Sequence, residues 1–95
     1  MYELDKAAFG QFLAQLRREK GMTQKELAAT LYVSDKAVSK WERGLSVPDI
    51  SLLVPLAEQL NVTVAELLQG RRVEEEQRFT REETEDLIRK ALTFS

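Results

Sequence analysis

The chain has 95 residues, 43% of them hydrophobic, and its sixteen acidic and fourteen basic side chains leave a formal net charge of -2. That length suits one domain with a single core, because such domains start at roughly 50 residues. There is no cysteine and no histidine, which excludes disulfides, the usual zinc ligands and the side chain best suited to proton transfer near neutral pH. We therefore expect no metal, no cofactor and no enzyme activity.

Membrane and export signals are missing from the sequence. No run of about 18 apolar residues occurs. Glu3 and Asp5 stand where a signal peptide would have a basic segment followed by an apolar one. We expect no membrane partner within the given chain and a cytoplasmic, nucleoid-associated protein, membrane-anchored only if the natural chain continues past Ser95.

Helical periodicity dominates from the first segment onward. Between Lys6 and Lys20, apolar residues recur at spacings of three and four, and Gly21 follows as a C-terminal stop. Thr23 and Glu26 then have the spacing of a capping box, which predicts a second helix to about residue 31.

A third helix is expected from the cap Ser34 to Gly44, with Val38 and Trp41 facing inward and Ala37 partly so. A fourth carries the apolar stripe Leu53, Leu56, Ala57 and Leu60.

Pro55 interrupts the pattern of the fourth helix. Since proline cannot donate a backbone hydrogen bond, this helix should either begin late, near Ser51, or kink. A short fifth helix is predicted between the cap Thr63 and Gly70.

Composition changes at Arg71, where RRVEEEQR is almost free of apolar residues and indicates a solvated linker or the exposed end of a helix. Thr80 to Glu83 has the spacing of another capping box, and the helix it opens carries an apolar strip. The strip consists of Leu87, Ile88, Ala91 and Leu92.

The second and third helices fit a helix-turn-helix, because the small Ala28 allows close crossing and Val38 fills the space between the helices. The stretch TQKELAATLYVSDKAVSKWERG resembles the lambda-repressor and Cro type of domain, also called the xenobiotic-response-element family. The resemblance spans about Phe9 to Leu68. It implies an all-α fold: a five-helix lambda-repressor-like DNA-binding domain over 6–70, with an extra C-terminal helix.

Within that domain the resemblance places the helix-turn-helix motif at 24–43 and the recognition helix at 35–43, with a charged linker and amphipathic helix over 71–95. It also implies DNA contacts along the start of the second helix, the outer face of the third and the residues just beyond. These are Gln24, Lys25, Ser34, Asp35, Lys36, Ala37, Ser39, Lys40, Arg43 and Ser46.

Side-chain chemistry agrees with that assignment. Lysine can donate to guanine or phosphate, serine can bond a base edge, and an alanine methyl can touch the thymine methyl. The Gln24 amide would bond a phosphate. Asp35 would be repelled by phosphate unless it accepts from cytosine, so helix capping is its favoured role.

Each assignment also has a structural alternative. Gln24 could be an ordinary exposed first-turn residue, Lys36 and Lys40 a solvated helix face, and Arg43 and Ser46 simple surface positions. Trp41 is assigned to the core, because it follows Val38 at helical spacing. The alternative is that its indole donates a hydrogen bond to a phosphate.

Two further positions follow from the resemblance. Arg17 and Glu42 match positions that commonly form an ion pair between the first and third helices, the alternative being two unpaired surface charges. Tyr32 departs from the pattern, because the family often has glycine at this turn, where a positive φ can be required. We expect either a strained turn or a phenol that reaches a phosphate.

The net negative charge does not exclude DNA binding, since between Arg17 and Arg43 there are seven basic and four acidic residues, a local charge of +3. Affinity depends on the potential at the docking face. Modest affinity per domain predicts a homodimer with two recognition helices on half-sites about 34 Å apart.

Three roles are open for the tail. It could pack back on the domain, form the dimer contacts, or connect to a further region of a longer protein. The candidate dimer contacts are Leu87, Ile88, Leu92 and Phe94.

The function expected from the sequence is a bacterial or phage-type transcriptional regulator, a repressor, that binds double-stranded DNA at an inverted repeat. The alternative is a protein-interaction module or antitoxin of the same fold. The sequence does not specify the operator, the regulated genes, an effector, or repression against activation.

Overall fold

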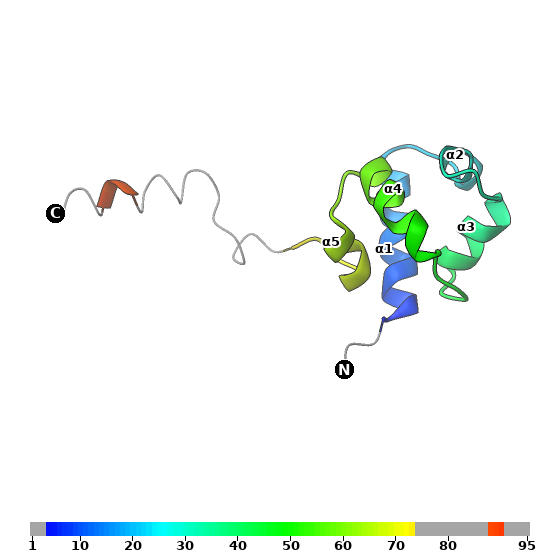
Figure 1. Cartoon of the computed structure of the whole chain (residues 1–95), viewed down its shortest axis with the longest axis horizontal. Helices are drawn as coiled ribbons and strands as arrows, with labels where there is room; N and C mark the ends of the chain where they lie inside the picture. The colour runs from blue at the N-terminus through cyan, green and yellow to red at the C-terminus, as the bar shows by residue number, and fades with distance from the viewer. Residues whose placement is uncertain (1–3, 74–87, 91–95) are drawn as a thin grey trace.

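The computed structural model describes residues 4–73 and 88–90, and over these ranges the regular structure is entirely helical. Five helices are α1 (Lys6–Glu19), α2 (Gln24–Thr30), α3 (Asp35–Glu42), α4 (Ile50–Leu60) and α5 (Val64–Gln69). Helices α3 and α5 both pack against α1, α2 packs on α3, and α4 packs on α5 (Figure 1). The predicted all-α, five-helix lambda-repressor-like arrangement is confirmed.

The predicted helix starts are confirmed by their caps. The Thr23 hydroxyl accepts from the Glu26 amide at 3.0 Å, and the Glu26 carboxylate accepts from the Thr23 amide at 2.9 Å. Ser34 caps α3 by accepting from Ala37, and Thr63 caps α5. Such caps each stabilise by about 1 kcal/mol, so the helix boundaries are fixed locally.

Helix ends also lie where the sequence places them. Gly21 and Gly44 follow α1 and α3 with φ of 69° and 73°, in the left-handed region that glycine adopts without strain. Helix α4 begins at Ile50, capped by Asp49, which is the late start near Ser51 expected from the proline. Pro55 nonetheless lies inside α4.

One core joins the five helices. Its largest fully buried side chains come from all of them: Phe9, Leu13, Leu16, Leu27, Val38, Leu56 and Leu67. Trp41 is 5% exposed and belongs to this core, as its spacing from Val38 predicts. The third helix therefore has its apolar side inward and its polar side outward.

Gly10 sets how closely α1 approaches α3. A Cβ built at Gly10 would lie 2.4 Å from the Trp41 carbonyl oxygen and 2.7 Å from that of Glu42. Both obstacles are backbone atoms at the end of α3, so they can yield only if the helices move apart. The position of α3 against α1 thus depends on the absence of a side chain at Gly10.

We predict that Gly10→Ala destabilises the domain by about 1–3 kcal/mol, the usual cost of overpacking. In a solvent-exposed helix the same change stabilises by up to about 1 kcal/mol. Urea unfolding measures the change in the free energy of unfolding. The control compares Gln11→Ala with Gln11→Gly, because Gln11 is the exposed next position and this pair reports the helix propensity of α1. A gain in stability for Gly10→Ala would contradict the close approach.

Candidate nucleic-acid interface

Helix α3 presents a polar surface to solvent. Lys36 and Lys40 are exposed and one helical turn apart, and Ser39 is partly exposed beside them. Asp35 is the first residue of α3 and the cap itself is Ser34, so the Asp35 carboxylate lies in the first turn, where the helix dipole favours negative charge. The structure thus places Asp35, Lys36, Ser39 and Lys40 on the solvent side of α3, whereas Ala37, also assigned to DNA, is partly buried and packs against the core.

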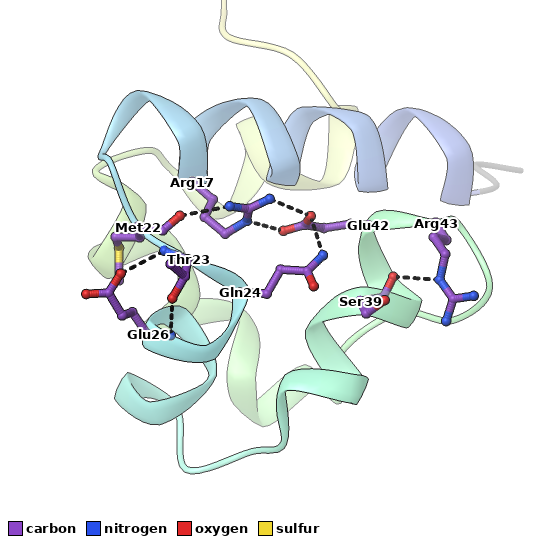
Figure 2. A network of polar contacts seen from close by, with 8 residues as sticks. All are labelled: Arg17, Met22, Thr23, Gln24, Glu26, Ser39, Glu42 and Arg43. Atoms are coloured by element: carbon purple, nitrogen blue, oxygen red, sulfur yellow. Dashed lines mark hydrogen bonds and ion pairs between the residues drawn. The ribbon is translucent and has the colours of Figure 1, made fainter.

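The orientation of α3 is held by an ion pair with α1. Arg17 Nε and Nη2 donate to the two carboxylate oxygens of Glu42, at 2.6 Å and 3.0 Å, and Nη1 donates to the Met22 carbonyl at 2.8 Å (Figure 2). Only 12% of the Arg17 side chain and 6% of the Glu42 side chain are exposed. The hydrogen bonds to Glu42 raise the pKa of the Arg17 guanidinium above its already high ordinary value. The pair implied by the resemblance is therefore bidentate and shielded from water.

Gln24 connects α2 to the same carboxylate. Its amide nitrogen donates to Glu42 Oε1 at 3.0 Å, and Figure 2 shows Arg17 and Gln24 converging on Glu42 from two different helices. An amide nitrogen carries two hydrogens, so one donor is left for the predicted phosphate contact. The sequence interpretation assigned Gln24 to DNA and missed this bond, because nothing in the spacing relates positions 24 and 42.

Four basic side chains of α2, α3 and the residue after α3 are exposed: Lys25, Lys36, Lys40 and Arg43. Arg43 Nε donates to the Ser39 carbonyl at 3.3 Å, which keeps its side chain along the end of α3 (Figure 2). Ser46 is partly exposed in the loop that follows. Two acids of α2 and α3 form structural bonds: hydrogen bonds from Thr23 lower the pKa of Glu26, and Glu42 is paired with Arg17. Asp35 is exposed at the start of α3.

Of the four candidate dimer contacts, Ile88 lies within the described residues. Leu87, Leu92 and Phe94 lie outside the described residues, as does the capping box predicted at 80–83. Ile88 is 55% exposed in a short helical stretch at 88–90. Before the undescribed part, Val73 donates its amide to Glu66 at 2.9 Å, and Arg72 pairs with Glu19 at 2.6 Å.

Two other kinds of site are absent from the described ranges. No group of three or more histidine, cysteine, aspartate or glutamate side chains there could hold a metal ion. None of the helices there has both the length and the hydropathy to cross a membrane.

The family model for the helix-turn-helix, HTH_3, matches residues 13–67. The chain belongs to this helix-turn-helix family. The transcriptional activator BcrR of Enterococcus faecalis is 42% identical over 78 residues, which cover 82% of this chain and 36% of BcrR. The chain therefore spans about a third of the length of that relative.

Two similar structures were solved with DNA. The P22 c2 repressor bound to a synthetic operator has a TM-score of 0.63 and 28% identity, covering 73% of this chain and 98% of the repressor. The biofilm regulator SinR in complex with DNA has a TM-score of 0.58 and 38% identity, covering 63% of this chain and 97% of SinR. Both likenesses extend over most of the domain described above.

We predict that Arg17→Ala and Glu42→Ala each destabilise the domain by about 3–5 kcal/mol, because each leaves a buried charge without its partner. The double variant should lose clearly less than the sum of the two. A double-mutant cycle by urea unfolding measures this coupling.

The matched control for that cycle is the exposed pair Glu19 and Arg72, with side chains 45% and 53% exposed and the same 2.6 Å separation. Surface pairs contribute about 0–1 kcal/mol, so its variants should have little effect. Additive losses at Arg17 and Glu42 would contradict a coupled pair.

Proposed function

We propose that this protein is a sequence-specific transcriptional regulator that places α3 in the major groove of double-stranded DNA. The observation that carries the proposal is the polar outer face of α3, held in one orientation by Glu42 through Arg17 of α1 and Gln24 of α2. A reading helix must present its side chains to the base edges in a fixed geometry. The relatives solved with DNA support this use of the fold.

Base reading is assigned to α3. Lys36 and Lys40 can each donate to guanine O6 and N7, and Ser39 can donate or accept at a base edge. Ala37 offers a methyl group for contact with thymine. Ser34 and Asp35 precede them at the end of α3 that enters the groove first in helix-turn-helix proteins.

Phosphate binding is assigned to the flanks. Gln24 retains one amide hydrogen beyond its bond to Glu42, and Lys25 next to it is exposed. Arg43 and Ser46 lie at and after the end of α3. These groups would fix the register of the domain on the duplex while the α3 side chains supply sequence preference.

Two copies are proposed to act together on an inverted repeat, because the surface of one domain offers few cations for a duplex and two recognition helices reach half-sites about 34 Å apart. The proposed dimer contacts are Leu87, Ile88, Leu92 and Phe94. Occlusion of a promoter by such a dimer would repress. The relatives include an activator and a repressor by name, so both directions of regulation occur among them.

The test is selection of binding sites from a random duplex library at moderate salt with the purified chain. We expect an enriched inverted repeat with half-site centres about one helical turn apart. A single enriched half-site would contradict binding as a dimer and would still support sequence-specific binding by one domain. No enrichment, with the helical circular dichroism signal intact, would favour the protein-interaction role instead.

For base reading, we predict that Lys40→Ala costs about 1–3 kcal/mol on the selected duplex and relaxes the preference at one base position. Lys20→Ala, which changes another exposed lysine, at the end of α1, is the control. Fluorescence anisotropy on selected and random duplexes measures both. Equal losses on the two duplexes for Lys40→Ala would remove this residue from base reading.

A further inference from the structure

Tyr32 occupies a strained and exposed position that the packing of the domain does not explain. Its φ is 58°, in the left-handed region, and its side chain is 96% exposed. An L-residue pays about 1–2 kcal/mol there, and bulky residues are uncommon. Because the aromatic ring stays in water, no burial of apolar surface offsets this conformational cost.

The turn around Tyr32 is well ordered by its own hydrogen bonds. The amides of Leu31 and Val33 both donate to the Ala28 carbonyl at 3.1 Å, and the Tyr32 amide donates to Ala29 at 3.3 Å. Val33 packs against the core on the inner side. The backbone of the turn therefore directs the Tyr32 side chain outward, into solvent.

This turn leads directly into the proposed reading helix. Tyr32 lies two residues before Ser34, the cap of α3, so the two Cα atoms are at most about 7.6 Å apart. The major groove is about 12 Å wide. When the N-terminal end of α3 lies in it, the preceding turn must pass close to a sugar-phosphate strand that borders the groove.

We infer that Tyr32 is an additional DNA contact, whose phenol hydroxyl donates a hydrogen bond to a backbone phosphate beside the groove that α3 enters. Tyrosine hydroxyls are among the groups that bind DNA phosphates. The residue would then be retained for binding at the expense of stability, a known form of trade-off. This inference rests on the proposed function and extends the contact surface to the turn.

Two variants of Tyr32 in the full chain test the inference on selected and random duplexes. Tyr32→Phe removes only the hydroxyl and should weaken binding about three- to tenfold on selected and random duplexes alike. Tyr32→Gly removes the contact and the strain, so it should weaken binding at least as much while raising Tm by roughly 4–8 °C. If Tyr32 had a structural role only, its substitution would not be expected to raise the stability of the domain and weaken DNA binding at the same time.

Asn61→Gly is the matched control. Asn61 is the other described non-glycine residue with positive φ, at 59°, and it ends α4, the helix that packs on α5. Its substitution relaxes a similar backbone conformation and should leave DNA affinity unchanged.

The salt dependence of DNA binding distinguishes a phosphate contact by a neutral hydroxyl from one by a charged side chain. Tyr32→Phe should leave the slope of log K against log salt unchanged, because a neutral donor displaces no counterion, whereas Lys25→Ala should reduce that slope by about 1. Wild-type affinity in Tyr32→Phe, or equal or tighter binding in Tyr32→Gly, would overturn the inference alone. A wild-type chain that binds no duplex would overturn the proposed function and this inference with it.

Discussion

The Glu42 carboxylate is the interaction on which the arrangement of the first three helices depends. One oxygen accepts from Arg17 and Gln24 and the other from Arg17, so a single side chain at the end of α3 is bonded to both α1 and α2. A buried charge is tolerated only when its hydrogen-bonding capacity is used. Among the described residues, no buried side-chain nitrogen or oxygen lacks a partner. A rotation of α3 would break several of these bonds together.

Such a network contributes orientation more than net stability, because well-packed apolar residues often replace a buried ion pair without loss. The close backbone approach of α1 to α3 at Gly10 also fixes the position of α3. Gly10 and Arg17 are seven residues apart, about two turns of α1, so they share the face that meets α3. At Gly10 the helices touch through backbone, and at Arg17 they are joined by charge. For a helix that reads base edges, a fixed direction is the property that matters.

The features that could be predicted from the sequence are local ones. Capping at Thr23 and Ser34 and the glycine stop at Gly21 depend on residues within a few positions of each other. The positive φ at Tyr32 was instead implied by the family resemblance. The amphipathic patterns of the helices likewise identify the core, including Trp41.

Contacts between distant positions could not be obtained in this way. The bond from Gln24 to Glu42 spans 18 residues, and that from Arg72 to Glu19 spans 53. The close approach at Gly10 depends on the crossing of two helices, so it becomes visible only in three dimensions. For Arg17 and Glu42, family resemblance supplied the pairing that spacing alone would have left open.

We propose above all that the outer face of α3 is the surface that contacts DNA. The most direct test is a titration of the isotope-labelled chain with a selected duplex, followed by amide chemical shifts in NMR. We expect the largest changes in α3, in the turn before it and at the start of α2, with small changes in α5. Changes concentrated on α4 and α5, with the amides of Lys36, Ser39 and Lys40 unaffected, would contradict it.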